Sequence, residues 1–206
     1  MSSRDLILHK LGGSTHMPGY RPAADQFTEQ TGADCLSRYI ELANESLTTT
    51  VCVEAWQMVP AAIADYLYSN NLDPMVVLDS NAPLDEVDWK DSDIAFRPPP
   101  LRDDGDVLVS DCFGAVAENG ALVISSNDGI SIANDFLAET HIVLLPEGRI
   151  FPGLADLWQV LRSGRHMPRE FCLVTGPSRT ADLGVPAKMG AHGPARVHVI
   201  IIADAE

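Results

Sequence analysis

Short apolar runs alternate with amphipathic segments along most of this chain. Runs rich in β-branched residues predict strands at 48–55, 75–80, 106–110, 121–125, 141–146, 171–175 and 195–202. Apolar residues at helical spacing predict helices at 4–11, 23–47, 61–68, 132–139 and 154–162, and a single helical turn at 115–118. Alternating strands and helices are typical of an α/β fold with a mostly parallel sheet flanked by helices.

The same pattern suggests two parts. Residues 1–47 are expected to form a helical N-terminal extension, and residues 48–206 the α/β domain. Within that domain, segment 81–102 is rich in Asp and Pro and is interpreted as an excursion over the surface, with a short strand around 94–96.

Composition excludes several classes of partner. The chain has 14 basic and 29 acidic residues in 206, a formal charge of −15, which repels nucleic acid and anionic membranes. No apolar run approaches the ~20 residues of a membrane-spanning helix, and the N-terminus lacks a secretory pattern. We therefore expect a cytoplasmic protein with no nucleic-acid partner and no membrane insertion.

The cysteines give no sign of a cluster. Four are present, at Cys35, Cys52, Cys112 and Cys172, without any CxxC spacing. They are interpreted as buried small hydrophobic residues in a reducing compartment. The expectation is that this chain holds no metal and no cofactor.

The loop after 171–175 has residues suited to binding an anion. Gly176 allows a sharp turn, and Pro177 suits the first turn of a following helix, whose free N–H groups would hold the anion. Arg179 adds donors that match a phosphate or carboxylate. Alternatively, this is a plain strand-to-helix connection in which Arg179 pairs with a nearby carboxylate. The residues expected to contact a ligand here are Gly176, Ser178, Arg179, Thr180 and Asp182.

A second loop, at 190–194, precedes the last predicted strand. It places His192 between Gly190 and Gly193, and all three are candidate ligand-binding residues at the mouth of the same pocket. The strands that border the two loops are expected to be neighbours. His192 could also be purely structural.

Few other polar residues suggest chemistry. Glu118 is a candidate catalytic carboxylate, or else an exposed glutamate at a helix end. Asp111 and Asp128 are interpreted as structural loop carboxylates, His198 as a core or edge residue, and His141 has no evident partner. The catalytic residue stays unknown, with Glu118 and His192 as candidates.

Two C-terminal motifs resemble those of a known family. GPSRTADL (176–183) followed by GAHGP (190–194) resembles the paired signature of the LUD-domain proteins of the lactate-utilisation protein C type. AENGALVIS (117–125) and THIVLLPEGRI (140–150) are similar to further segments of that family. Gly184 stands where the family commonly has Glu, Ala191 where it has Val, and Asn119 where it has Thr. The similarity covers about half of the chain.

The resemblance implies a fold like that of sugar-phosphate isomerases and coenzyme A transferases. It also implies a subunit or accessory protein of an L-lactate oxidation system that binds a small anionic ligand, beside an iron–sulfur protein and a second LUD-domain protein. It supplies no catalytic residue. Two alternatives remain: a free-standing isomerase, transferase or cyclo-ligase acting on a phosphorylated or CoA-linked substrate, and a non-catalytic assembly protein.

Overall fold

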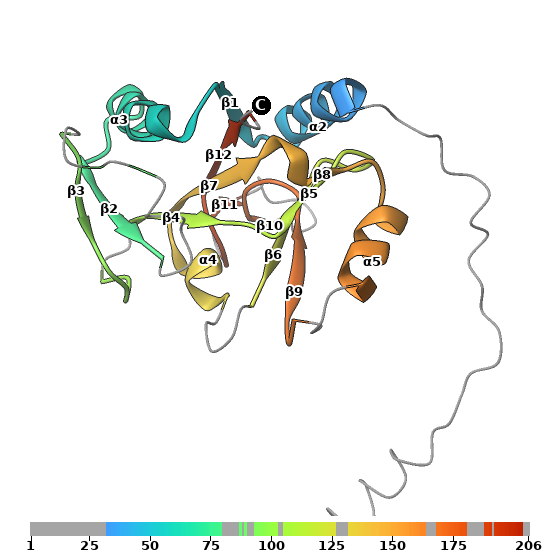
Figure 1. The fold of residues 1–206 in the computed structure, drawn as a ribbon. Helices are drawn as coiled ribbons and strands as arrows, with labels where there is room; N and C mark the ends of the chain where they lie inside the picture. Colours follow the sequence, from blue (N-terminus) through green and yellow to red (C-terminus); the bar gives the residue numbers. More distant parts are fainter. Residues whose placement is uncertain are drawn as a thin grey trace, which may run out of the picture.

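The computed structural model describes residues 32–79, 87, 89, 93–102, 105–126, 132–163, 168–180, 188–190 and 192–203 (Figure 1). The predicted helix at 4–11, the first part of that at 23–47, and Asp128 and Asp182 lie outside these residues. Within them, the chain forms the expected α/β arrangement, with helices on both sides of a parallel sheet.

A six-stranded, wholly parallel sheet forms the centre. Its order is β1 (Thr49–Val53), β12 (Arg196–Ile202), β7 (Thr140–Pro146), β4 (Val107–Asp111), β2 (Met75–Leu78) and β3 (Ala95–Arg97). The central strands β12, β7 and β4 are buried for most of their length, which explains why they are continuous apolar runs in the sequence.

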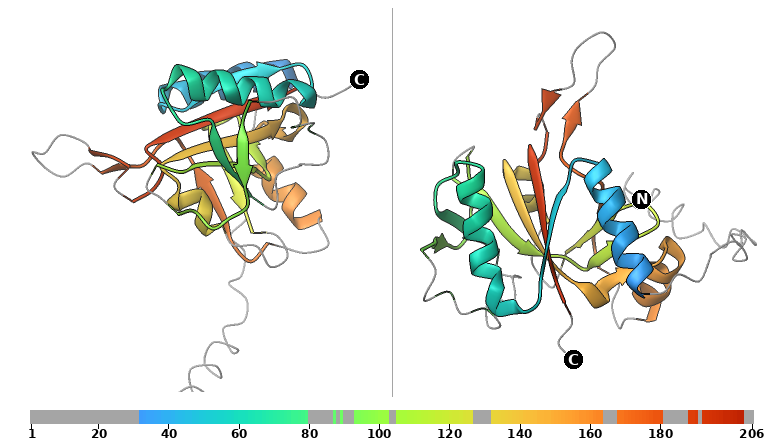
Figure 2. Two further views of the ribbon diagram at one scale, coloured as in Figure 1. Left: turned by 90° about the vertical axis from the view of Figure 1, so that its left-hand side faces the viewer. Right: turned by 90° about the horizontal axis from the view of Figure 1, so that it is seen from above.

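Two different layers cover the faces of this sheet. On one face, α3 (Val59–Ser69), preceded by the short helix η2 (Trp56–Met58), packs Ile63 and Leu67 against Ile142 and Ile200. On the other face, α2 (Gly32–Glu45) packs Tyr39 against residues such as Val199. Figure 2 shows α2 and α3 on opposite sides of the sheet when the molecule is seen from above.

A second, four-stranded sheet lies on the α2 side. Its order is β8 (Ile150–Phe151), β5 (Gly114–Val116), β6 (Ala121–Ser125) and β9 (Phe171–Val174). Leu122 and Ile124 of β6 join the core that α2 shares with the large sheet. Helix α5 (Leu154–Ser163) covers Val116 and Val123 with Leu157 and Leu161.

Strand β5 replaces the predicted helical turn at 115–118, which is wrong. Gly114, Ala115 and Val116 pair with β6 on one side, and Ala115 and Val116 with β8 on the other. Alanine has little preference for strand, so pairing across the sheet decides the conformation here. The remaining elements between β6 and β8 are α4 (Ala133–Leu137) and η4 (Glu147–Arg149).

A two-stranded ribbon projects from the molecule. Strand β10 (Arg179–Thr180) pairs antiparallel with β11 (Lys188–Met189), and Figure 2 shows the ribbon extending away from the sheets. The predicted helix start at Pro177 is therefore wrong, because the chain enters a strand at Arg179. Gly–Pro predicts a turn but does not specify the element that follows it.

Two of the four cysteines are buried and two are not. Cys35 and Cys112 belong to the core, as expected, but Cys52 is exposed on β1 and Cys172 is half-buried on β9. Both strands lie at the edge of their sheets, and this accounts for the wrong expectation of burial. In the described part of the chain, no helix is long and apolar enough to cross a membrane.

The N-terminal boundary of the α/β domain stays a prediction. Helix α2, which the proposed division assigns to the extension 1–47, contributes Cys35, Tyr39 and Ala43 to a core shared with both sheets. Its packing thus joins it to the body of the fold.

Candidate functional site

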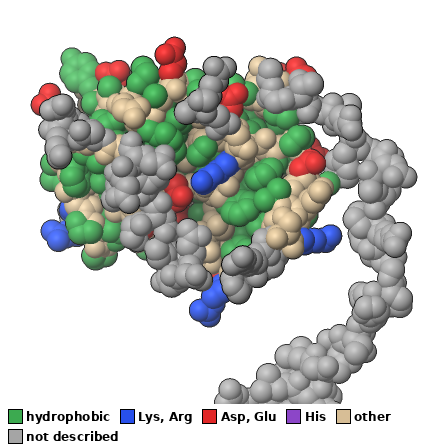
Figure 3. All heavy atoms as spheres, viewed as in Figure 1, with side chains coloured by type: hydrophobic (Ala, Val, Ile, Leu, Met, Phe, Trp, Pro, Cys, Tyr) green, Lys and Arg blue, Asp and Glu red, His purple; other side chains and the backbone are tan. Residues whose placement is uncertain are grey.

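A cavity of about 530 Å³ opens at the carboxyl ends of the parallel strands. Asp79 follows β2, Asp111 ends β4, and Arg149 lies in η4 directly after β7. Ligands of open parallel sheets bind at this edge, because the loops that leave the strands meet there. Figure 3 shows the face viewed in Figure 1, where a basic side chain lies beside hydrophobic ones near the middle. The lining residues are Asp79, Ser110, Asp111, Cys112, Phe113, Ile124, Ser125, Ile132, Asp135, Gly148, Arg149, Phe151 and Val160.

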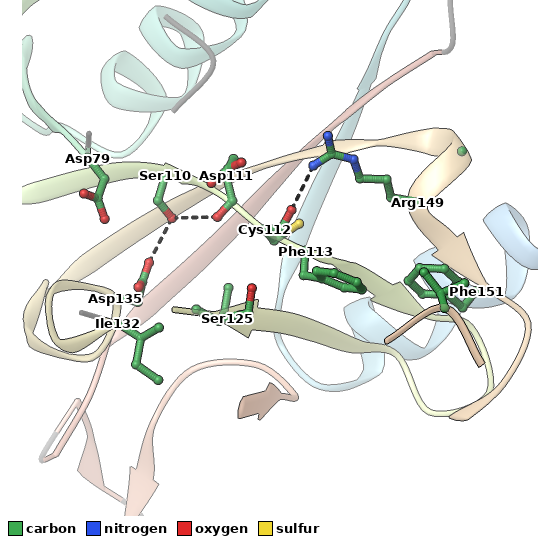
Figure 4. Close-up of a pocket in the computed structure, with 13 residues that line it drawn as sticks. Asp79, Ser110, Asp111, Cys112, Phe113, Ser125, Ile132, Asp135, Arg149 and Phe151 are labelled. Atoms are coloured by element: carbon green, nitrogen blue, oxygen red, sulfur yellow. Dashed lines mark hydrogen bonds between the residues drawn. The ribbon is translucent and has the colours of Figure 1, made fainter. Parts of the chain in front are cut away.

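The carboxyl of Asp111 has a perturbed acidity. The pKa of Asp111 is raised to about 6: burial is the largest cause, Asp79 and Asp135 act in the same direction, and the charge of Arg149 opposes them in part. The guanidinium of Arg149 is held over the cavity by a hydrogen bond of 3.2 Å from its Nη1 to the carbonyl oxygen of Cys112 (Figure 4). One cation and a carboxyl that titrates near neutral pH thus face the same space.

Three buried polar groups meet next to Asp111. Oγ of Ser110 lies 2.9 Å from Oδ1 of Asp135 and 2.8 Å from Nε2 of His141. Nε2 of His141 is also 3.2 Å from the same Oδ1. The three side chains come from β4, α4 and β7, and the pairing of β4 with β7 brings Ser110 and His141 together.

The hydrogen positions in this group follow from its geometry. An ionised carboxylate only accepts, so the tautomer of His141 that carries its proton on Nε2 is the one that satisfies the contact with Oδ1 of Asp135. Ser110 then accepts from His141 and donates to Asp135. In a nucleophilic triad the histidine would instead accept from the serine and donate to the carboxylate through its other nitrogen. The group therefore orients Asp135 and leaves Ser110 without a general base.

The remaining wall of the cavity is apolar. The rings of Phe113 and Phe151 are stacked, with centroids 6.2 Å apart and an angle of 27° between their planes. Ile124, Ile132 and Val160 complete this wall. In Figure 4, Asp79, Ser110 and Asp135 gather at one end of the cavity, and Arg149 lies toward the other end, with Phe113 and Phe151.

The described loop residues among those predicted from the sequence lie at the opposite end of the strands, away from the cavity. Segment 192–194 precedes β12, so it lies at the amino end of that strand. The two predicted loops do meet: N–H of Ser178 donates to the carbonyl of Pro194 over 2.8 Å, and N–H of Gly190 to the carbonyl of Ser178 over 2.9 Å. Gly193 packs close to Ser178, and His192 is exposed.

The strands that border these loops are not neighbours, contrary to expectation. β9 pairs with β6 in the small sheet, whereas β12 lies between β1 and β7 in the large one. The loops meet through the β10–β11 ribbon instead. Gly176 has a positive φ of 83°, and a β-carbon there would clash with the carbonyl oxygen of Ser46, so this glycine serves packing against the end of α2.

Glu118 has a structural contact. Its Oε2 accepts a hydrogen bond of 3.1 Å from the N–H of Leu154, the first residue of α5. A carboxylate at a helix N-terminus satisfies a free donor and complements the helix dipole. Glu118 is exposed and is not among the residues that line the cavity.

The sequence contained a signal for this cavity. Asp79 and Asp111 each end a buried strand, and acidic residues at the ends of parallel strands indicate a shared site. Ser110, Asp135 and His141 gave no comparable signal, because they are brought together only by the fold. Within the described ranges, no group of three or more His, Cys, Asp or Glu side chains is placed to hold a metal ion.

Comparisons with known proteins agree with this fold and these motifs. The family model described as the LUD domain matches residues 103–202. Lactate utilization protein C of Exiguobacterium sp. strain AT1b is 31% identical over 123 residues, which are 57% of this chain and 53% of that protein. The Bacillus subtilis protein of the same name is 29% identical over 93 residues, 43% of this chain and 39% of that protein. The chain thus spans about half the length of these relatives or less.

A solved structure extends the likeness to most of the fold. The crystal structure of a DUF162 family protein from Deinococcus radiodurans superposes with a TM-score of 0.60 and 20% sequence identity, over 84% of this chain and 99% of that chain. At this identity the likeness establishes the fold alone. The family model and the curated relatives thus show that about half of this chain is similar to LUD-domain proteins, of which the curated relatives are named lactate utilization protein C.

Proposed function

We propose that this chain is the component of an L-lactate utilisation system that binds a small hydroxylated carboxylate. The names of its relatives support the system, and the cavity supports the ligand class. The observation that carries the proposal is the placement of Arg149 and Asp111 on one cavity, close enough for the guanidinium to lower the pKa of that carboxyl.

Each of these two groups has a clear role toward such a ligand. Arg149 is the basic residue among the described side chains that line the cavity, and it offers a planar fork of donors to the carboxylate of a 2-hydroxy acid. Asp111 then accepts the hydrogen of the adjacent hydroxyl. With a pKa of about 6 it is mostly ionised at neutral pH, yet basic enough to take up a proton.

Oxidation itself requires a partner. Conversion of a 2-hydroxy acid to a 2-oxo acid releases two electrons and two protons, and Asp111 can take up a proton, but neither Asp111 nor Arg149 can take up the electrons. We infer that the chain works in the cytoplasm beside an iron–sulfur protein and a second LUD-domain protein, which take the electrons, as its family resemblance implies. Its own residues then bind the acid and accept a proton.

The size of the cavity favours the alternative of a free-standing enzyme acting on a larger substrate. A volume of about 530 Å³ lies in the range of sites for drug-sized ligands and exceeds what lactate fills. A phosphorylated or CoA-linked substrate would also place its anionic group on Arg149.

Calorimetric titration of L-lactate, inorganic phosphate and coenzyme A into the wild type and Arg149→Ala tests both functions. A charge-assisted hydrogen bond contributes about 1.5–3 kcal/mol, so the variant should bind L-lactate roughly ten- to a hundredfold more weakly. Arg162→Ala, which removes an exposed arginine from the last turn of α5, is the matched control. Equal affinity of the wild type and Arg149→Ala for L-lactate would refute the proposed site.

The loop site on the ribbon is a second candidate location for the anion. Arg179 is exposed on β10, but the N–H of Ser178 already donates to the carbonyl oxygen of Pro194, and the N–H of Gly190 to that of Ser178. Fewer backbone donors are therefore left for an anion than the sequence suggested. Arg179→Ala, measured in the same titration, decides between the sites: a loss of L-lactate affinity in this variant alone would move the site to the ribbon.

A further inference from the structure

The polar groups of the cavity form two separate ends along β4. Ser110 binds Asp135 at one end, and the carbonyl of Cys112 binds Arg149 at the other. Ser110 lies near the end of β4 and Cys112 directly after it, two positions further on, which is about 6.6 Å in extended chain. Asp111, between them, is the group whose pKa Arg149 influences.

The end at Asp135 can receive hydrogen-bond donors. Among the residues that the structure describes, Ser110 and His141 both contact this carboxylate at Oδ1, and we assign Oδ2 to the ligand. Asp79 adds a second carboxylate to the same end (Figure 4). Ionised carboxylates accept hydrogen bonds only, so this end favours hydroxyl groups and disfavours an anion.

L-lactate is too short to reach both ends. Its hydroxyl and carboxylate are on adjacent carbon atoms, so a molecule held by Arg149 and Asp111 leaves the end at Asp135 empty. A ligand that uses the whole cavity has an anionic terminus at Arg149 and further hydroxyls several carbon atoms away.

We propose that the ligand which fits this cavity best is a linear polyhydroxylated carboxylate, bound with its carboxylate at Arg149 and its distal hydroxyls at Asp135. The assignment rests on the proposed function, because it takes the same cavity and the same anchor for the carboxylate. Asp135 determines the preference for a longer ligand. His141, behind it, is a positioning residue that fixes the orientation of the Asp135 side chain.

The test compares D-gluconate with L-lactate by calorimetric titration, with neutral sorbitol and sorbitol 6-phosphate as further probes. The wild type should bind D-gluconate at least tenfold more tightly than L-lactate, and sorbitol without measurable affinity. Asp135→Asn turns an acceptor into a partial donor and should reduce the ratio of the two affinities at least fivefold. Ser110→Ala removes a hydrogen-bond partner of Oδ1 of Asp135 and should also reduce this ratio. It replaces Asp135→Asn as the test if that variant does not fold.

Two further variants complete the design. Asp73→Asn changes an exposed carboxylate and should leave the ratio unaltered. His141→Gln keeps an N–H donor, so its ratio of D-gluconate to L-lactate affinity should stay closer to that of the wild type than the ratio of His141→Phe. Loss of packing alone would not produce this difference.

Each outcome has one meaning. Equal affinity for the two acids, or an unchanged ratio in Asp135→Asn and Ser110→Ala, overturns the assignment and leaves the proposed function intact. Binding of sorbitol 6-phosphate but not of D-gluconate overturns the choice of a carboxylate. If neither acid binds, the proposed function and this inference both fail.

Discussion

Oγ1 of Thr49 lies 2.7 Å from Nδ1 of His198 and links the edge strand β1 to the central strand β12. The imidazole is 6% exposed and is stacked on Tyr66, with ring centroids 4.1 Å apart. Burial lowers the pKa of His198 to about 4, and a hydrogen bond with the backbone of Thr49 opposes this shift. His198 is therefore a core residue, as the sequence suggested, and one that makes folding sensitive to acid.

The first prediction concerns this acid sensitivity. Because the folded pKa of His198 lies below the unfolded value, its neutral form contributes full stability above pH 6.5, and this contribution falls as the pH drops toward 4. Between pH 7.5 and 5 the wild type should lose about 2 kcal/mol more unfolding free energy than His198→Gln. Urea unfolding at both pH values measures this difference. His192→Gln, at an exposed position, should behave like the wild type.

The second prediction concerns Asp111, whose contribution to stability changes with pH in the opposite direction to that of His198. The pKa of Asp111 in the folded chain, about 6, exceeds the ordinary value of 3.8, so its contribution to stability is present below pH 3.8 and lost as the pH rises through 6. Asp111→Asn should unfold with about 1–3 kcal/mol more free energy than the wild type at pH 7.5, a gap that closes toward pH 4. Thermal melts at both pH values, with Asp73→Asn as control, check this. Destabilisation at pH 7.5 would show that the charged carboxylate is satisfied by the fold.

The third prediction concerns the glycine of the GPS motif. Gly176→Ala requires a left-handed residue with a side chain that clashes with Ser46, and should cost roughly 2–3 kcal/mol of unfolding free energy. Gly105→Ala is the control, since nothing lies within 4 Å of a β-carbon there. Equal denaturation midpoints for the two variants would mean that Gly176 is retained for ligand binding and not for packing against α2.

The fourth prediction separates two roles for Glu118. Loss of its bond to the N–H of Leu154 in Glu118→Ala should cost about 1 kcal/mol, while Glu118→Gln, which keeps an acceptor, should stay close to the wild type. Affinity for L-lactate should be the same in both variants and the wild type. A tenfold loss of affinity in Glu118→Gln would show instead that this carboxylate contacts the ligand.

Periodicity in the sequence was sufficient for most of the fold. The runs that became β4, β7 and β12 are continuous and apolar because both of their faces are buried, and helices α3 and α5 show their apolar face at helical spacing. β5 and β10 were mistaken for helical turns, because strands of two or three residues are specified by their partners and not by their own composition.

The candidate site was less accessible to sequence reasoning. Gly–Pro turns and an arginine drew attention to the ribbon, since such residues stand out locally. Ser110, Asp135 and His141 are ordinary residues in a strand, a helix and a strand, and only the pairing of β4 with β7 and the packing of α4 bring them together. The raised pKa of Asp111 depends on burial and on three charges distant in sequence, so no local pattern could have indicated it.

The position of β12 between β1 and β7 also bears on how this protein is made. A ribosome that has just added residue 190 has released β1, α3 and β7, but the strand that joins β1 to β7 has not yet been synthesised. Until residues 196–202 emerge, β1 lacks β12, the strand with which it pairs in the described part of the chain. Contacts of such wide sequence separation form slowly. We therefore expect the nascent chain to expose the unpaired edges of β1 and β7, which are apolar and can bind chaperones, until β12 pairs with both strands.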